Sequence, residues 1–184
     1  MMSMTTPLAW ASFLAGLILA LLAGLLLALP QQSAALLKAF PRHVWAGRAL
    51  AAITILWSAW LLFDAHFGWV DANRMLVYGL IPVAYLVIIF FADDLLAARA
   101  FGGLLLLLPL PLLEAAFIHP STLRLVITVF AYALAIVGMA LVWSPYLFRQ
   151  WTARWIAQDR LKAWIPAATG LAGLILLALG LTAY

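Results

Sequence analysis

The chain has 184 residues, of which 68% are hydrophobic and 9% are charged, and its formal net charge is +4. A soluble globular chain is about half apolar and about a quarter charged, so this composition excludes a soluble fold of the same size. The absence of cysteine excludes disulfides, thiol catalysis, cysteine-ligated zinc and iron–sulfur clusters. The apolar runs are about 20 residues long and show no period-two alternation, so we predict an all-α, polytopic helical bundle in a membrane.

We predict a single transmembrane domain over residues 1–184 with six membrane-spanning helices. The predicted spans cover about residues 8–29, 44–63, 75–92, 100–118, 123–143 and 164–184. The first span lacks the basic region that precedes the short apolar core of a secretory signal, so we expect it to remain in the mature protein.

Small residues recur at helical spacing in the first span, where they would allow close contact with another helix. They are Gly16, Ala20, Ala23 and Gly24. The string Leu-Ala-Gly-Leu-Ile-Leu occurs at 14–19 and again at 171–176, in the sixth span. Glycine, alanine and leucine are common in membrane helices, so we interpret this repeat as coincidence. If the small-residue stripes of the first and sixth spans are used, we expect them to pack against partner helices.

Three prolines are predicted to disturb the spans. Pro82 removes one backbone donor from the third span and should bend it. Pro109 and Pro111 interrupt the fourth span and leave carbonyl groups unpaired near the middle of the membrane. A neighbouring side chain, a water molecule or a local change of helix type must satisfy those carbonyl groups.

Residues 146–160 are predicted to form a helix at the level of the lipid headgroups. Basic and aromatic residues recur there at helical spacing, as is typical of interfacial helices. The candidate anchors are Arg149, Trp151, Arg154 and Trp155. Asp159 breaks this pattern and indicates that the helix can end near Gln158.

Basic residues predict the orientation of the spans, because cytoplasmic loops carry an excess of lysine and arginine. With six spans, eight of the ten basic residues fall on one side, and only Arg74 and Arg124 fall on the other. The eight are Lys38, Arg42, Arg48, Arg99, Arg149, Arg154, Arg160 and Lys162. We therefore predict a multi-pass cell-membrane protein with both termini on the non-cytoplasmic side.

Two charges flank the short predicted turn at residues 119–122. Glu114 and Arg124 lie on average about five residues from the centre of this turn, which places both roughly 7 Å below the membrane surface. Because an isolated charge in hydrocarbon is costly, we predict an ion pair between Glu114 and Arg124. This pair would either fix the register of the hairpin or form a proton or cation site beside the proline break.

A second ion pair is a candidate on the cytoplasmic side. Arg48 lies one turn inside the second span, at the level of Asp93 and Asp94, which follow the third span. The alternative is that Arg48 extends independently to the headgroups while one of the aspartates caps the next helix.

We predict no cofactor, no metal site and no catalytic residue. The three histidines are His43, His66 and His119. Haem ligands would be expected within the spans, but His66 and His119, the two on the outer side, lie in turns. No phosphate-binding loop, nucleophile elbow or zinc-protease motif is present, so the sequence gives no positive signal for an enzyme.

These features favour a structural or accessory subunit, or a scaffold, in a membrane complex. One alternative is a transporter or channel for a small solute, an ion or a proton that uses the broken fourth span and Glu114. Another is a lipid-modifying enzyme at headgroup level with Asp93 and Asp94 as an acidic pair. The expected partners are the lipid bilayer and other membrane subunits or further copies of this chain. We expect no nucleic-acid partner, because the basic residues are spread over many loops.

Overall fold

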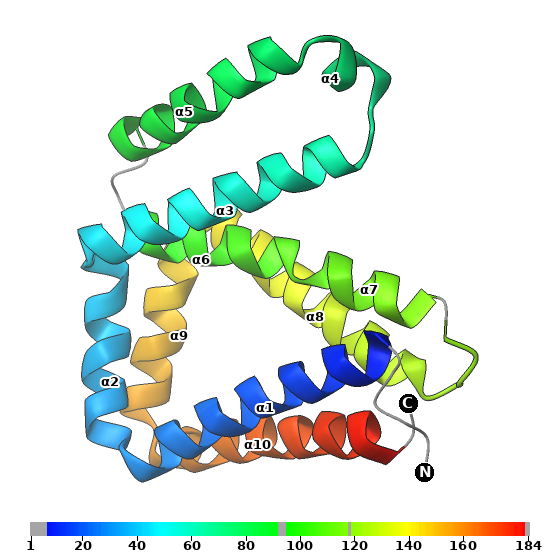
Figure 1. Cartoon of the computed structure of the whole chain (residues 1–184). Coiled ribbons are helices and arrows are strands. Elements are labelled where there is room, and N and C mark those ends of the chain that lie inside the picture. The colour runs from blue at the N-terminus through cyan, green and yellow to red at the C-terminus, as the bar shows by residue number, and fades with distance from the viewer. Residues whose placement is uncertain (1–6, 92–94, 118, 183–184) are drawn as a thin grey trace. The chain divides into compact units, whose positions relative to one another are not determined.

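The computed structural model describes residues 7–91, 95–117 and 119–182, and over these residues the chain is helical and contains no strand (Figure 1). The all-α prediction is therefore confirmed. A helical backbone satisfies its own hydrogen-bonding groups, which is what an apolar chain of this composition requires in lipid.

The chain folds into two compact units, each assembled from segments that are far apart in the sequence. The first unit contains Met1–Lys38, Leu108–Ala135 and Gln150–Tyr184. The second unit contains Ala39–Leu107 and Ile136–Arg149.

Among the described residues, five helical segments are long and apolar enough to cross a membrane, as expected of a multi-pass membrane protein. They are α1 (Pro7–Ala28), α3 (Val44–Asp64), the pair α6 (Leu96–Leu107) and α7 (Pro109–Phe117), α8 (Arg124–Trp143) and α10 (Asp159–Thr182). These segments match five of the six predicted spans. The third predicted span corresponds to α5 (Arg74–Phe91), which is apolar but shorter.

Short helices connect these segments, and local sequence signals explain several of their boundaries. The connecting helices are α2 (Pro30–Ala39), the 3-10 turn η1 (Phe40–Arg42), α4 (Gly68–Ala72) and α9 (Tyr146–Ala157). Proline is tolerated in the first turn of a helix because its missing N–H would have no partner there, which suits Pro30 and Pro109. At the start of α3, His43 Nδ1 accepts a hydrogen bond from the amide of Ala46 at 3.1 Å.

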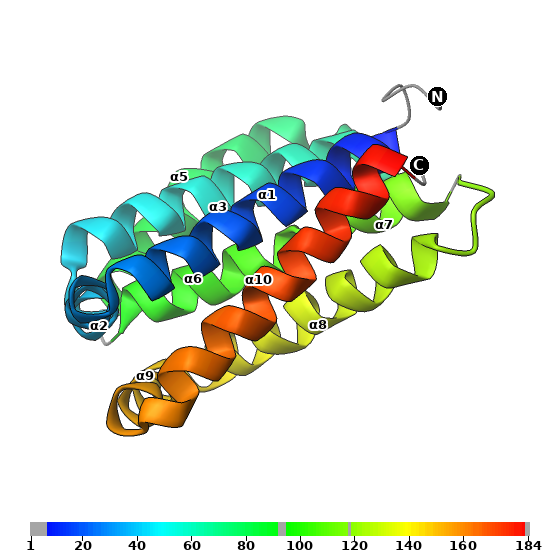
Figure 2. The same ribbon diagram turned by 90° about the horizontal axis from the view of Figure 1, so that it is seen from below.

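In the first unit, α1 and α10 lie side by side and run in opposite directions (Figures 1 and 2). A Cβ atom added to Gly16 would lie 2.6 Å from the Leu177 nitrogen and 2.7 Å from the Gly173 oxygen. Reciprocally, a Cβ atom on Gly173 would lie 2.7 Å from the Ala20 nitrogen and 2.9 Å from the Gly16 oxygen. Only glycine permits two backbones to approach this closely.

This contact corrects one interpretation of the sequence. Gly16, Ala20 and Ala23 of α1 pack against α10 of the same chain and not against a partner helix. Each copy of the repeated hexapeptide contributes the central glycine of the contact, Gly16 in one and Gly173 in the other. Gly24 does not take part, since a Cβ atom there meets no heavy atom of the described chain within 4 Å.

The apolar core of the first unit joins these two helices to α7 and to the beginning of α8. Leu8, Ile127 and Leu176 are the large side chains at its centre, and each is almost fully buried. The other buried members are Ala9, Leu112, Ala115, Ala116 and Ala131. The abundance of alanine allows these helices to approach closely.

In the second unit, α3 and α6 are neighbours that run in the same direction. Near the start of both helices, a Cβ atom on Gly47 would lie 2.9 Å from the Ala97 nitrogen. Further along both helices, a Cβ atom on Gly103 would lie 2.9 Å from Cγ2 of Thr54. The Thr54 hydroxyl also donates to the Ala100 oxygen at 3.3 Å.

The helix α5 packs against α3 in the opposite direction. The Tyr85 hydroxyl donates to the Arg48 oxygen at 3.3 Å, near the start of α3. Near the other end, the rings of Phe63 and Tyr78 stack with their centroids 4.7 Å apart. Pro82 lies inside α5, and the helix continues on both sides of it.

A second glycine contact joins α6 to the part of α8 that belongs to this unit. A Cβ atom on Gly102 would lie 2.8 Å from Leu141 Cβ and 3.0 Å from the Gly138 oxygen. A Cβ atom on Gly138 would lie 2.8 Å from the Gly102 oxygen and 3.0 Å from the Leu106 nitrogen. The contact is reciprocal, like the one between α1 and α10.

Candidate functional site

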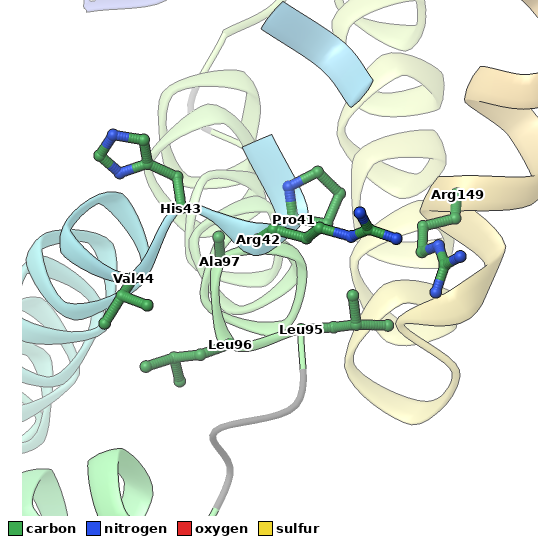
Figure 3. Close-up of a pocket in the computed structure, with 8 residues that line it drawn as sticks. All are labelled: Pro41, Arg42, His43, Val44, Leu95, Leu96, Ala97 and Arg149. Carbon is green, nitrogen blue, oxygen red and sulfur yellow. The ribbon is translucent and has the colours of Figure 1, made fainter. Parts of the chain in front are cut away.

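A pocket of about 490 Å³ opens in the second unit, where α3 and α6 begin (Figure 3). It is lined by residues 41–44, residues 95–97 and Arg149. Two of the lining side chains are arginines, Arg42 and Arg149, and within the described part of the chain no carboxylate lines the pocket. Both arginine side chains are exposed and extend along the same side of the pocket.

Three phenylalanines hold the two arginines near each other. Phe40, two residues before Arg42, packs against Phe148, the residue before Arg149, with ring centroids 5.4 Å apart. Phe101 of α6 packs edge-on against both rings, at 5.9 Å from Phe40 and 6.4 Å from Phe148. These aromatic contacts join segments that are about 100 residues apart in the sequence, so the position of the two guanidinium groups depends on tertiary packing.

Two helix beginnings add positive potential to this pocket. The first turn of α3 starts at Val44 and the first turn of α6 starts at Leu96, and both residues line the pocket. The first amides of a helix have no acceptor within the helix, and the helix dipole places partial positive charge there. Leu95 lies just before α6 with a φ of 58°, in the left-handed region that a non-glycine residue seldom adopts. The pocket therefore combines two guanidinium groups with two helix N-termini.

Sequence reasoning missed this pocket. It counted Arg42 and Arg149 among the basic residues that indicate orientation, and it treated Arg149 only as an interfacial anchor. The available signal was that both arginines fall on the same predicted side of the membrane. That signal selects eight basic residues and does not identify which two of them meet.

The structure gives Arg124 partners other than the predicted one. Its Nη1 donates to the oxygen of Phe117 at 3.1 Å and to the oxygen of His119 at 3.0 Å. Those carbonyl groups belong to the end of α7 and the turn that follows, so the guanidinium satisfies acceptors that the ended helix leaves behind.

Glu114 lies in α7 with an exposed side chain. The ion pairs within the described residues are Asp71 with Arg74 at 2.6 Å and Asp159 with Lys162 at 2.8 Å. Neither of them includes Glu114 or Arg124. The ion pair of Glu114 with Arg124 stays a prediction.

Arg48, Asp93 and Asp94 were the members of the second predicted pair, and both aspartates lie outside the described residues. The Arg48 guanidinium carbon lies 5.8 Å from the centre of the Trp45 ring, within the range of a cation–π contact. Its Nε is buried and has no hydrogen-bond partner among the residues that the structure describes. Arg48 therefore lies against an aromatic ring of its own helix.

The proline break lies where the sequence places it. The helix α6 ends at Leu107 and α7 begins at Pro109, with Leu108 in a turn between them. Pro111 falls within the first turn of α7, where a missing N–H leaves no acceptor unsatisfied.

The helix predicted over 146–160 is α9, which ends at Ala157, before Asp159 and next to the end near Gln158 that the pattern indicated. Its Arg149 and Arg154 side chains are exposed, and Trp151 is 40% exposed. Trp155 differs from the expected anchor, since it is only 5% exposed. It packs inside the protein, where its Nε1 has no hydrogen-bond partner among the described residues.

The histidines make local contacts with the backbone. His43 Nδ1 accepts from Ala46, and His119 Nδ1 accepts from the amide of Ser121 at 3.2 Å. Over the described ranges, no three side chains of histidine, aspartate or glutamate come together as metal ligands would. The chain matches no protein-family model, and no curated protein or solved structure is significantly similar to it.

Proposed function

We propose that the protein is a six-span membrane protein, with both termini outside the cytoplasm, that serves as a structural or accessory subunit of a membrane complex. The observation that carries the span count is the parallel packing of α3 and α6. Two neighbouring helices that cross a bilayer in the same direction require the intervening chain to return across it. Of the helices described between Asp64 and Leu96, α4 has five residues, and α5 is left to make that crossing.

The length and packing of α5 support this role. Its 18 residues extend about 27 Å at 1.5 Å per residue, close to the roughly 30 Å of a hydrocarbon core. It runs antiparallel to α3, which it contacts through the Phe63–Tyr78 stack and the Tyr85–Arg48 hydrogen bond. The orientation follows from the basic residues, eight of which then face the cytoplasm.

Cysteine accessibility tests the span count, because the natural chain contains no cysteine. In Asn73→Cys and Thr122→Cys we expect labelling by an impermeant maleimide from the non-cytoplasmic side. In Gln32→Cys and Gln158→Cys we expect labelling only after the cytoplasmic side is opened. If Asn73→Cys and Thr122→Cys react from opposite sides, the six-span proposal is wrong. If all four positions react from the reverse side, the orientation alone is wrong.

The use of polar groups within the spans supports a structural role. Arg124 donates to two carbonyl groups of its own hairpin. The hydroxyl groups of Thr54, Thr128 and Thr169 each donate to the carbonyl four residues earlier. These groups have partners within their own helix or hairpin, whereas a transport pathway would need polar groups that face a wetted cavity.

Site-specific photocrosslinking in native membranes tests the subunit role. A photoreactive residue would replace Leu56 on α3 or Val83 on α5, which are 63% and 51% exposed. Ala51, buried in the α3–α6 contact, is the matched control. We expect a crosslink to one protein of defined mass from Leu56 or Val83 and none from Ala51. Crosslinks to lipid alone from both exposed positions would contradict the subunit role.

A transporter is the second candidate, and one observation favours it. The span formed by α6 and α7 is interrupted at Leu108, and Glu114 follows in α7 without an ion partner among the described residues. Broken helices and intramembrane carboxylates are features of transport sites. Proton or cation flux into liposomes containing the protein, abolished in Glu114→Gln, would favour transport over the subunit role.

A further inference from the structure

The pocket at the beginnings of α3 and α6 carries positive charge, which favours the binding of an anion. Arg42 and Arg149 reach it from segments that the three phenylalanines hold together. Two guanidinium groups at one pocket repel each other, and an anion bound between them removes that repulsion. Arginine is suited to this task, because its planar fork of donors matches the oxygens of phosphate.

The helix beginnings indicate the same ligand chemistry. Residues of the first turns of α3 and α6 line the pocket, and backbone amides at helix beginnings bind phosphate groups in many proteins. The Ala97 nitrogen packs close to Gly47, whose lack of a side chain allows the two helix beginnings to lie together. The cation pair and the helix beginnings are separate features of the sequence, and the fold brings them to one place.

The volume and lining of the pocket favour a ligand larger than an inorganic ion. Its volume of about 490 Å³ lies in the range of sites for small organic ligands and exceeds what one phosphate group fills. Pro41, Val44 and Leu96 supply apolar lining to the same pocket. A ligand that carries a phosphate on a short organic body fits both parts of this lining.

We propose that this pocket binds a phosphate-bearing group, either the headgroup of an anionic phospholipid or a free phosphate monoester of similar size. Arg42 and Arg149 would contact the phosphate oxygens, and the amides at the starts of α3 and α6 would add to the positive potential. A lipid source follows from the membrane placement under the proposed function, since a pocket where two spans begin lies at the level of the headgroups. Recognition of the phosphate itself does not depend on that placement.

Native mass spectrometry of the full chain in detergent tests this proposal. The two probes are dioctanoyl phosphatidic acid and glycerol 3-phosphate, titrated separately. We expect one equivalent of at least one probe to bind. In the double variant R42Q/R149Q, the affinity for that probe should fall about tenfold or more. In each single variant, R42Q or R149Q, the affinity for that probe should fall by several times. The single variants therefore test the proposal even if the double variant is misfolded.

Two matched variants separate the pocket from general attraction to anions. R99Q/R154Q removes two exposed arginines that do not line the pocket, and we expect its affinity to stay within about twofold of the natural chain. R42K/R149K keeps both charges but loses the planar fork, and we expect an intermediate affinity. Circular dichroism and gel filtration establish that each variant retains its helices and its size.

The outcomes distinguish the two sources of the ligand and decide whether the pocket binds phosphate at all. Binding of glycerol 3-phosphate supports recognition of a free phosphate monoester, and binding of phosphatidic acid alone supports a lipid headgroup. The proposal is overturned if neither probe binds, if R42Q/R149Q binds as tightly as the natural chain, or if R99Q/R154Q loses as much affinity. These measurements are made in detergent, so a different span count in the labelling experiment would leave their result unchanged.

Discussion

The contact between α1 and α10 and the contact between α6 and α8 use the same arrangement of backbones. Gly16 meets residues 173 and 177, and Gly102 meets residues 138 and 142. In both cases the partner glycine contacts the first glycine and also the residue four positions after that first glycine. Each contact therefore has local two-fold symmetry between antiparallel helices. The first contact lies within the first unit and the second contact lies within the second unit.

The two contacts differ in what surrounds the central glycines. Along α1 and α10 the close approach continues, because Gly180 faces Ala9 and Phe13, and Gly170 faces Ala23. In the second unit α6 presents glycines to two neighbours, with Gly102 against α8 and Gly103 against Thr54 of α3. The comparison teaches that the first contact is a long seam between two helices, while the second is one point in a junction of three helices.

The largest effect is expected when the long seam is broken. In Gly16→Leu, the first side-chain carbon would lie 2.6 Å from the Leu177 nitrogen, and backbone atoms cannot move without separating the helices. We expect the free energy of unfolding to fall by about 3 kcal/mol or more. Reversible unfolding in mixed detergent micelles measures it. Gly24→Leu is the control, because its Cβ meets no heavy atom of the described chain within 4 Å. Equal losses in the two variants would contradict the seam.

A smaller loss is expected at the junction of three helices. In Gly102→Ala, the added carbon would lie 2.8 Å from Leu141 Cβ and 3.0 Å from the Gly138 oxygen. We expect a loss of about 2 kcal/mol in the same unfolding experiment. In Gly103→Ala the close atom is Cγ2 of the Thr54 side chain, so we expect about half that loss. A greater loss in Gly103→Ala than in Gly102→Ala would reverse this ranking of the two faces of α6.

The polar contacts of the two units form a second comparison. We expect the hydrogen bonds of Arg124 in the first unit to contribute more stability than those of Thr54 in the second unit. Arg124→Gln removes a charged donor from the Phe117 and His119 carbonyl groups, so we expect a loss of about 1.5–2 kcal/mol. A double-mutant cycle with Glu114→Gln then separates the carbonyl contacts from the predicted ion pair. We expect a coupling energy near zero. A coupling of about 1 kcal/mol or more would instead reveal that Glu114 and Arg124 pair in the membrane.

The smallest effect is expected at the polar contact of the second unit. Thr54→Val keeps the shape of the side chain and removes a hydroxyl that donates to Leu50 at 2.8 Å and to Ala100 at 3.3 Å. Hydrogen bonds between membrane helices contribute about 0.6 kcal/mol on average, so we expect a loss of that size. Thr169→Val, which loses only a bond within its own helix, is the control. If the control loses more, the hydrogen bond between α3 and α6 contributes little.

Sequence reasoning located the helices well because the bilayer leaves little choice of backbone structure. The predicted span 44–63 corresponds to Val44–Asp64, and the predicted span 123–143 corresponds to Arg124–Trp143. The break before Pro109 was equally visible, since proline cannot continue the hydrogen bonding of the preceding helix. The partner of Arg124 was not visible, because the carbonyl groups that receive its hydrogen bonds carry no signature in the amino-acid letters.

By itself, the sequence determined that this chain is helical and apolar along its length, about where its long helices lie, and how its basic residues are distributed. Those properties depend on neighbours along the chain and on the solvent, so composition and periodicity are enough to read them. Tertiary structure alone decided which faces meet. Gly16 and Gly24 are equivalent in the sequence, yet one has a backbone nitrogen 2.6 Å from its missing side chain and the other has open space. Arg42 and Arg149 likewise share a pocket only because three aromatic rings from distant segments pack together.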